Sequence, residues 1–270
     1  MVTLPRTERG AADMTGRLAN RVAIVTGGGT GIGAGIAERF ALEGARVVIS
    51  GRRAEPLETV ARQVRDAGGK IHTVACDSAT EAGVEELFRT TEEQFGLVDI
   101  LVNNAAIAGP VASIWEQETS GWEETLRINL TGPWLCCRAA ALSMMPRRSG
   151  KIINIGSISG KRPLATRTPY TATKMGLLGL TRTLALELGA YDINVNLISP
   201  GAIETPRMDE LAEHWHTTRE ALVSGIAATA ALKRVGEPSD IANLAVFLAT
   251  DEARNIQGID ITVDAGVFYS

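Results

Sequence analysis

Histidine, cysteine and tyrosine are scarce in this chain of 270 residues, with three of each. Metal centres in proteins usually combine three or four His, Cys, Asp or Glu ligands. The chain has too few histidines for a His-rich site, and His214 and His216 have no apparent third ligand, so we predict that the chain holds no metal site. A phenol that acts as an acid or a base must be Tyr170, Tyr191 or Tyr269.

Long apolar runs and a cysteine framework are also missing. No stretch reaches the ~18 uninterrupted apolar residues of a membrane helix, so we expect no membrane span. Residues 1–18 mix charges with Pro and Gly and lack the apolar run of a signal peptide, so we expect a flexible arm outside the fold. Cys76, Cys136 and Cys137 are an odd number at spacings that do not suit disulfides, so we expect free thiols and a cytoplasmic location.

Neither sign of charge dominates. The chain has 27 Lys and Arg against 31 Asp and Glu, a formal net charge of −4. Proteins that bind nucleic acid usually carry a strong basic surface, so this balance argues against a nucleic-acid partner.

The chain does contain a regular alternation of short apolar runs with helical stretches. Seven apolar, β-branched runs predict strands at residues 22–26, 46–50, 71–75, 98–103, 151–155, 193–198 and 259–263. Helices are expected near residues 32–44, 55–67, 80–95, 119–145, 171–190 and 238–249. Continuous apolar runs are typical of strands buried on both faces of a parallel sheet. We predict an α/β fold, a single Rossmann-type doubly wound domain over residues 19–270 with a seven-stranded parallel sheet and helices on both faces.

A glycine-rich loop follows the first predicted strand. It reads Thr26-Gly27-Gly28-Gly29-Thr30-Gly31-Ile32-Gly33 and leads directly into a helix. Glycine leaves no Cβ between the backbone and a pyrophosphate, and a helix N-terminus offers free N–H groups to that anion. At the first strand–helix junction of a parallel sheet, this pattern predicts a dinucleotide site. The expected contacts are Gly27, Gly29, Thr30, Gly31, Ile32 and Gly33.

The end of the second predicted strand bears on which dinucleotide binds. An NAD enzyme is expected to place an acidic residue there for the adenosine ribose, but this chain reads Ser50-Gly51-Arg52-Arg53. The missing carboxylate removes repulsion against a 2′-phosphate, and Arg52 can pair with that phosphate. We therefore favour NADP(H), with Arg52 and Arg53 as contacts. The alternative is an NAD(H) site beside which both arginines are solvated.

Two further segments complete a set of four motifs. Tyr170 and Lys174 stand four residues apart where a helix is expected, so they share one helical face. Gly156-Ser157 follows the fifth predicted strand, and Asn103-Asn104-Ala105-Ala106 follows the fourth. Together with the glycine loop, the order and spacing of these motifs resemble the short-chain dehydrogenase/reductase family over residues 20–270.

The resemblance implies a catalytic tetrad of Asn129, Ser157, Tyr170 and Lys174. Tyr170 would pass a proton to or from the substrate oxygen as a hydride moves between substrate and nicotinamide. Lys174 would lower the pKa of that phenol and bind the nicotinamide ribose, so both residues are expected cofactor contacts too. Ser157 would hydrogen-bond the substrate oxygen. Asn129 lies in a helix that the following Gly-Pro pair should bend, and would hold a water linking Lys174 to solvent.

The family pattern implies further cofactor contacts at Asp77, Asn103, Ala105, Pro200, Gly201, Ile203 and Thr205. Asp77 would contact the adenine, and Asn103 and Ala105 would line the adenosine side. The residues after the sixth strand would hold the nicotinamide carboxamide. Ala106 stands where many relatives have glycine.

The substrate side is expected to come from loops at the carboxyl ends of the strands. We predict that residues 206–231 form a helical lid over the site. Residues 160–167 carry three cations, which could attract an anionic substrate, remain solvated or meet another subunit. The closest general resemblance is to 3-oxoacyl-[acyl-carrier-protein] reductases, which grip their carrier with basic residues. Arg148 matches one such position but Tyr191 replaces another, so a broader ketone or alcohol substrate is expected.

We predict an NADP(H)-dependent oxidoreductase that moves a hydride between nicotinamide and a ketone or secondary alcohol. One alternative is an NAD-dependent dehydrogenase of a sugar, polyol or other alcohol. Another is a cofactor-sensing binding protein, although the intact tetrad argues against it because a sensor needs no proton donor. The resemblance also implies a homotetramer built through residues 119–145, 171–190 and the C-terminal strand, near Asp264-Ala265-Gly266.

Overall fold

Seven parallel strands form one sheet in the computed structural model, which describes residues 16–268. The strands are β1 (Val22–Thr26), β2 (Arg46–Gly51), β3 (Lys70–Ala75), β4 (Ile100–Asn103), β5 (Gly150–Ile155), β6 (Ile193–Pro200) and β7 (Asp260–Val263). Their order across the sheet is β3-β2-β1-β4-β5-β6-β7. The predicted seven-stranded parallel sheet is confirmed.

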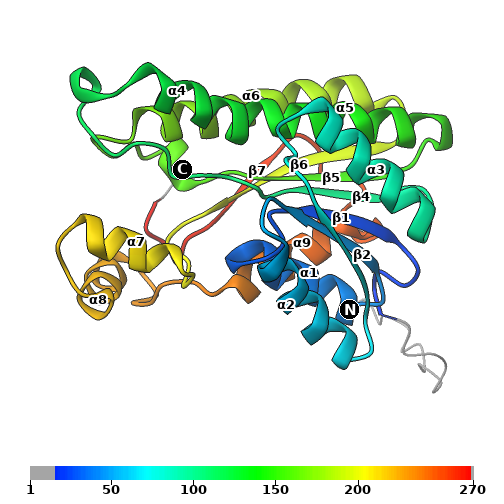
Figure 1. Cartoon of the computed structure of the whole chain (residues 1–270), viewed down its shortest axis with the longest axis horizontal. Coiled ribbons are helices and arrows are strands. Elements are labelled where there is room, and N and C mark those ends of the chain that lie inside the picture. The colour runs from blue at the N-terminus through cyan, green and yellow to red at the C-terminus, as the bar shows by residue number, and fades with distance from the viewer. Residues whose placement is uncertain (1–15, 269–270) are drawn as a thin grey trace, which may run out of the picture.

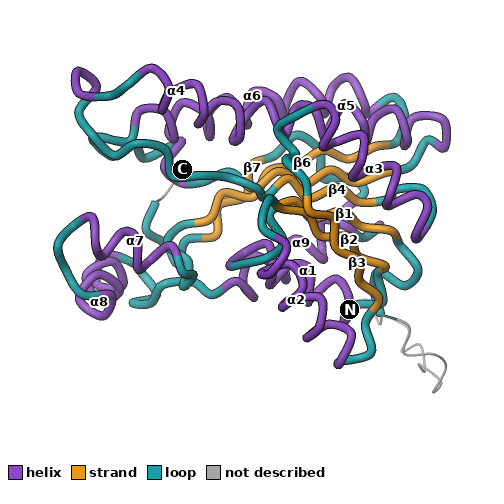
Figure 2. The backbone as a smooth tube through the Cα atoms, viewed as in Figure 1, coloured by secondary structure: helices purple, strands orange, loops and turns teal. Residues whose placement is uncertain are grey.

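Helices cover both faces of the sheet. They are α1 (Gly31–Leu42), α2 (Ala54–Asp66), α3 (Glu81–Phe95), α4 (Thr119–Leu126), α5 (Gly132–Met144), α6 (Thr168–Gly189), α7 (Arg207–His214), α8 (Arg219–Thr229) and α9 (Pro238–Ala249). Helices α3 to α6 lie on one face, and α1, α2 and α9 lie on the other (Figure 1). Figure 2 shows the twisted strands between these two layers. Within residues 16–268, no helix combines the length and apolar character needed to cross a membrane.

Each face of the sheet has its own hydrophobic core. All five residues of β1 are buried, because both sides of the strand meet helices. One core packs Ile36 and Phe40 of α1 against Val246 of α9. The other packs Leu87 of α3 with Met144 of α5. These two cores explain why the central strands of the sheet are mostly apolar.

The strand order reverses beside β1, which pairs with β2 on one side and β4 on the other. The chain runs outward through β2 and β3 and then crosses over to place β4 against the free edge of β1. In doubly wound folds such a reversal opens a crevice at the carboxyl ends of the strands, where ligands bind. The glycine loop after β1 and the segment after β4 meet at this crevice.

The folded part of the chain begins earlier than the arm predicted for residues 1–18. Residues 1–15, like Tyr269, lie outside the described residues. The side chain of Leu18 is only 1% exposed and packs in the core beneath α1. The N–H of Arg17 donates to Glu43 at 2.9 Å, and its guanidinium contacts Glu252 at 2.7 Å. An apolar side chain next to the first strand is thus drawn into the core, so the boundary expected after residue 18 is too late.

The long helix expected at residues 119–145 is interrupted by a π-turn at Arg127–Thr131, between α4 and α5. The N–H of Gly132 donates to the carbonyl of Arg127, five residues earlier. Pro133 has no N–H and cannot donate to the carbonyl of Asn129 four residues before it. The irregularity expected from the Gly-Pro pair is therefore a π-turn around Asn129 rather than a bend at the pair itself.

Residues 206–231 contain the two short helices α7 and α8, which pack on each other through Met208, Ala212 and Leu222. They project beyond the carboxyl end of the sheet (Figure 1). Their function as a lid stays a prediction.

Candidate active site

The glycine loop is held tightly against the end of β4. The hydroxyl oxygen of Thr26 accepts from the N–H groups of Asn104 and Ala105, both at 3.1 Å. The side-chain amide of Asn104 donates back to the carbonyls of Thr26 at 3.0 Å and Gly27 at 3.1 Å. A Cβ at Gly27 would lie 2.9 Å from the Cα of Ala105, and the φ of Gly27 is +65°. Only glycine fits this position without strain.

The start of α1 is equally crowded. A Cβ at Gly33 would lie 2.3 Å from the carbonyl oxygen of Gly27. The loop therefore brings its backbone close to the N-terminus of α1, where N–H groups without helical partners can bind an anion. Ile32 packs against the adjacent core, which anchors this first turn.

A cavity of about 300 Å³ lies over the glycine loop. Predicted cofactor contacts line it, namely Gly27, Gly29, Thr30, Arg52, Arg53, Asp77 and Ala105. These residues come from the ends of β1 to β4. They include glycines at which a Cβ would clash with neighbouring atoms, and they include two arginines. A dinucleotide offers an anionic pyrophosphate and an adenosine to such a surface, so the residues present fit that cofactor.

The two arginines after β2 are free to meet a phosphate. Arg52 is 58% exposed, and its guanidinium lies 3.8 Å from the carboxylate of Glu124, a loose surface pair of small energy. Arg53 is exposed beside it. Among residues 16–268, Asp77 is the only acidic residue that lines the cavity.

The carboxylate of Asp77 is already engaged on both oxygens. It accepts from the N–H of Ala79 at 3.0 Å and from Arg127 at 2.8 Å. Partial burial acts to raise the pKa of Asp77, but these hydrogen bonds and the charge of Arg127 outweigh burial and lower it. Asp77 is therefore a fixed carboxylate at the rim of the cavity.

The Asn103 side chain does not reach the cavity in which the sequence places it. It is 2% exposed, and its amide donates to the side-chain oxygen of Asn154 at 2.8 Å. Alternation along β4 turns this side chain into the sheet interior. Ala105, two residues later, lines the cavity instead.

The loop after β6 approaches the glycine loop from the other side. The N–H of Gly201, next to Pro200, donates to the carbonyl of Val263 at 2.9 Å. Ile203 is buried, and Thr205 lies so near Gly31 that a Cβ there would be 3.1 Å from the Thr205 methyl carbon. The residues predicted for the pyrophosphate and those predicted for the nicotinamide thus lie next to one another.

Tyr170 and Lys174 occupy successive turns at the start of α6, and both are buried. The ammonium of Lys174 lies 5.7 Å from the centroid of the Tyr170 ring and donates to the carbonyl of Ile155 at 2.7 Å. Ser157 lies two residues after the end of β5, and its hydroxyl oxygen accepts from the N–H of Ser159 at 3.1 Å. The structure therefore gathers these three predicted residues at the end of β5.

Asn129 is fixed behind this group by the π-turn. Its side-chain oxygen accepts from the N–H of Ile107 at 2.8 Å, and its amide donates to the carbonyl of Ile107 at 2.9 Å. The same amide donates to the hydroxyl of Thr173 on α6 at 3.3 Å. The side chain thus joins the π-turn, the segment after β4 and the helix that carries Tyr170.

Two arginines that are not among the predicted catalytic or cofactor-binding residues flank Tyr170. The guanidinium carbons of Arg167 and Arg207 lie 4.9 and 4.7 Å from the centroid of its ring. Arg167 belongs to the cationic segment 160–167. Arg207 starts α7, 37 positions from Tyr170 along the chain, so no local spacing pattern could reveal it.

These cations change the acidity of the phenol. Burial acts to raise the pKa of Tyr170, but Arg207, Lys174, a hydrogen bond with Ser157 and Arg167 together lower it to about 8. Burial also lowers the pKa of Lys174, since it penalises the charged ammonium. A phenol with this pKa can give up and regain a proton near neutral pH.

The other cations of segment 160–167 are placed away from Tyr170. The ammonium of Lys161 contacts Asp260 at 2.9 Å and donates to the hydroxyl of Thr262 at 2.7 Å. Arg162 is exposed. Both histidines of the predicted lid, His214 and His216, are exposed, and residues 16–268 contain no cluster of three or more His, Cys, Asp or Glu suited to a metal ion.

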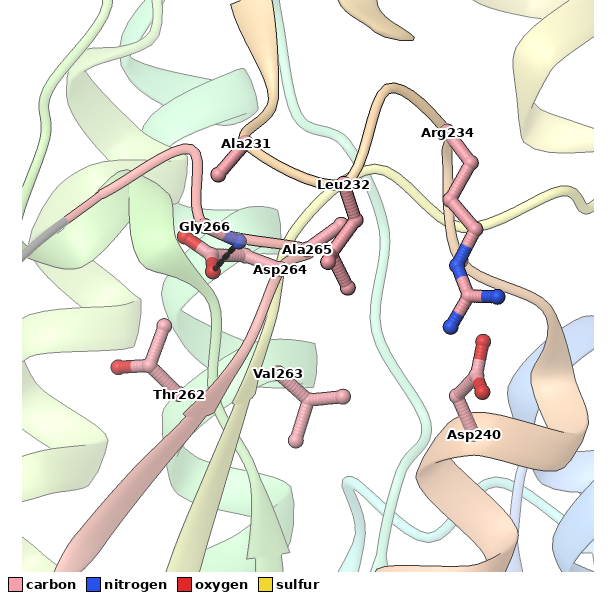
Figure 3. Close-up of a pocket in the computed structure, with 10 residues that line it drawn as sticks. Ala231, Leu232, Arg234, Asp240, Thr262, Val263, Asp264, Ala265 and Gly266 are labelled. Carbon is pink, nitrogen blue, oxygen red and sulfur yellow. Dashed lines mark hydrogen bonds between the residues drawn. The ribbon is translucent and has the colours of Figure 1, made fainter.

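A second cavity, of about 410 Å³, lies beside the end of β7 (Figure 3). It is bounded by residues 231–236 and 262–266 together with Asp240. Figure 3 shows the guanidinium of Arg234 and the carboxylate of Asp240 pointing toward one another at its edge. None of the predicted site residues lines this cavity, which separates it from the chemistry around Tyr170.

Known proteins resemble this chain along nearly its whole length. The profile of a family described as enoyl-(acyl carrier protein) reductase matches residues 27–268. The short-chain reductase protein NovJ of Streptomyces niveus is 38% identical over 247 residues, covering 91% of this chain and 93% of that protein. An NADP-dependent (R)-specific alcohol dehydrogenase of Lentilactobacillus kefiri is 40% identical over 260 residues, covering 94% of this chain and 98% of that protein. A crystal structure of a variant actinorhodin polyketide ketoreductase with NADPH has a TM-score of 0.89 and 33% identity, covering 94% of this chain and 99% of that one.

Proposed function

The chain belongs to the short-chain dehydrogenase/reductase family, and from this premise we propose that it is an NADP(H)-dependent enzyme in which Tyr170 exchanges a proton with the substrate oxygen. Members of this family are oxidoreductases that act on alcohol and carbonyl groups. The chain is therefore an enzyme, and not the cofactor sensor that the sequence alone left open. The substrate we propose is a ketone or a secondary alcohol.

The observation that carries the proposal is the cluster of Tyr170, Lys174 and Ser157 at the carboxyl end of β5. A bound nicotinamide supplies or accepts the hydride in this chemistry. During reduction, the hydroxyl of Tyr170 donates its proton to the carbonyl oxygen, and the nearby cations stabilise the phenolate that remains. During oxidation, that phenolate takes the proton of the alcohol. Ser157 hydrogen-bonds the same oxygen as its charge changes.

Asn129 takes part through its main chain in this proposal. Both ends of its side chain are occupied by Ile107. Pro133 leaves the carbonyl of Asn129 without its usual helical donor, so this carbonyl can hold a water. Such a water would return protons from solvent to Lys174, and from there to Tyr170.

The preference for NADP(H) is supported by Arg52 and Arg53 at the rim of the cavity over the glycine loop. No carboxylate stands at the end of β2 to accept from a ribose 2′-hydroxyl. One relative is named as NADP-dependent, and one structural neighbour was crystallised with NADPH. The NAD(H) alternative draws support from the contact of Arg52 with Glu124, which offers this arginine a partner inside the chain.

We also propose a homotetramer. Apolar side chains stand exposed along α5 and α6, among them Trp134, Leu142 and Leu186, of which Leu186 is 84% exposed. A second copy of the chain would cover this surface, in agreement with the helices that the family resemblance implies. A cytoplasmic location remains our proposal as well, and the three free cysteines support it.

Tyr170→Phe tests the proposed proton transfer. The substitution removes one hydroxyl and keeps the ring, so NADPH should still bind while turnover of any carbonyl substrate falls by about 10²-fold or more. Binding is measured by the fluorescence of bound NADPH, and turnover by its absorbance in a panel of ketones. Turnover equal to that of the unmodified enzyme would remove Tyr170 from the mechanism.

A further inference from the structure

Arg167 and Arg207 stand beside Tyr170 without any acidic partner. Within the described residues, neither guanidinium forms an ion pair, and the ammonium of Lys174 is bound to a carbonyl rather than to a carboxylate. Two of the acids near Arg207 in sequence pair with another residue: Asp209 and Glu204 contact Arg219 at 2.9 and 4.0 Å. Three cations therefore surround one phenol.

Arg167 is held in this place by its backbone. It precedes α6, and its carbonyl accepts from the N–H of Thr171 at 2.9 Å. Thr166, just before it, has a φ of +66° and accepts from the N–H of Ala112 at 3.2 Å. Arg167 itself is 9% exposed. These bonds fix the main chain of Arg167, and its guanidinium carbon lies 4.9 Å from the centroid of the Tyr170 ring.

A cation buried without a counter-charge is costly, and the cost is recovered when an anion binds. Burial and the charge of Arg207 both act to lower the pKa of Arg167. A neutral ketone would leave this repulsion in place. A ligand with a negative group would relieve it.

We propose that Arg167 and Arg207 bind a carboxylate of the substrate, so that the enzyme acts on short oxo acids and the matching hydroxy acids. This inference rests on the proposed function, because it takes Tyr170 as the group that meets the reacting oxygen. Both guanidinium carbons lie within 5 Å of the ring centroid of Tyr170. The carboxylate must therefore sit close to the reacting carbonyl, as in 2-oxo and 3-oxo acids.

The two arginines have the chemistry needed to bind a carboxylate. A guanidinium offers planar, paired N–H donors that match the two oxygens of a carboxylate. Arg167 comes from the fixed end of segment 160–167, whereas Arg207 comes from the first turn of α7. The reduction balances as oxo acid, NADPH and a proton giving hydroxy acid and NADP⁺: the carbonyl carbon gains the hydride, and its oxygen gains the proton of Tyr170.

The same arginines also stabilise the phenolate of Tyr170, and the experiment must separate the two effects. We compare each acid with its methyl ester, using 2-oxohexanoate and 3-oxohexanoate. Acid and ester need the same proton, so a change in the acidity of Tyr170 alters both rates alike. Their ratio of kcat/KM reports the carboxylate alone.

The unmodified enzyme should prefer at least one acid to its ester. Arg167→Gln and Arg207→Gln should each lower that acid-to-ester ratio by about 10- to 100-fold, the loss expected for a hydrogen bond to a charged group. Arg207→Lys keeps the charge but loses the paired donors, so its acid-to-ester ratio should lie between those of the unmodified enzyme and Arg207→Gln. Arg162→Gln removes an exposed arginine of the same segment and should leave the ratio unchanged.

A binding measurement supplies the second readout. The complex of enzyme and NADP⁺ is titrated calorimetrically with 2-hydroxyhexanoate, 3-hydroxyhexanoate and their methyl esters, after circular dichroism has shown that each variant is folded. An acid should bind more tightly than its ester, and the difference should shrink in both glutamine variants. Esters that bind and react as well as the acids would overturn the inference, as would equal losses for acid and ester. Neither result touches the proposed role of Tyr170, which Tyr170→Phe tests separately.

Discussion

The side chain of Asn129 exchanges two hydrogen bonds with the main chain of Ile107, at 2.8 and 2.9 Å. Ile107 belongs to the segment that follows β4, and Asn129 belongs to the π-turn between α4 and α5. This pair fixes the wall behind Tyr170 by joining a loop to a helix that are 22 residues apart in sequence.

We expect Asn129→Ala to destabilise the fold. The substitution leaves the N–H and the carbonyl of the half-buried Ile107 without these partners, at a cost of about 1–3 kcal/mol for each group that water does not reach. Chemical denaturation measures the free energy of unfolding. Asn255→Ala removes an exposed amide and serves as the control. Equal losses in the two variants would show that the Ile107 bonds contribute nothing.

The two directions of the reaction should depend on pH in opposite ways. The pKa of Tyr170 is lowered to about 8, and alcohol oxidation needs the phenolate whereas carbonyl reduction needs the phenol. The kcat/KM for oxidation should therefore rise as the pH increases through about 8, and that for reduction should fall. Parallel pH profiles in both directions would contradict this assignment.

Arg207→Gln should move both of those profiles to higher pH. Arg207 is the strongest of the groups that lower the pKa of Tyr170, and removal of its charge makes the phenolate less stable. The midpoint of the oxidation profile measures the change. Arg234→Gln, which removes a cation at the second cavity, should leave the midpoint where it is.

Arg52→Ala should weaken NADPH binding far more than NADH binding. If Arg52 pairs with the 2′-phosphate, the loss for NADPH is about 1–3 kcal/mol, as for other hydrogen bonds to charged groups. Fluorescence titration gives both dissociation constants. Arg62→Ala removes an exposed arginine of α2 and should alter neither of them. An equal effect of Arg52→Ala on the two cofactors would favour the NAD(H) alternative.

Leu18→Ala should cost about 2–5 kcal/mol of stability, because it deletes a buried leucine and leaves a cavity in the core. Leu42→Ala is the matched control, since Leu42 is 68% exposed. Thermal unfolding followed by circular dichroism compares the two variants. A small loss at Leu18 would place the N-terminal segment outside the cooperative fold.

Local features of the chain were enough to predict the sheet and much of the site. The seven apolar runs predict their strands because burial on both faces demands continuous apolar residues. The glycine loop and the Tyr170–Lys174 spacing are recognisable for a similar reason: each depends on neighbours within one turn or one loop. The carboxyl ends of parallel strands meet at one edge of the sheet, so the order of the motifs also indicates that they share a site.

Only the tertiary structure decided what faces Tyr170. Arg167 ends the loop that leads from β5 to α6, and Arg207 begins α7 after β6. The two loops lie side by side because β5 and β6 are paired, so both arginines reach Tyr170. The direction of the Asn103 side chain and the burial of Leu18 depend in the same way on contacts between distant segments. Sequence periodicity describes the neighbours along one element, whereas the charge around a phenol is set by whatever the fold brings within a few ångströms of it.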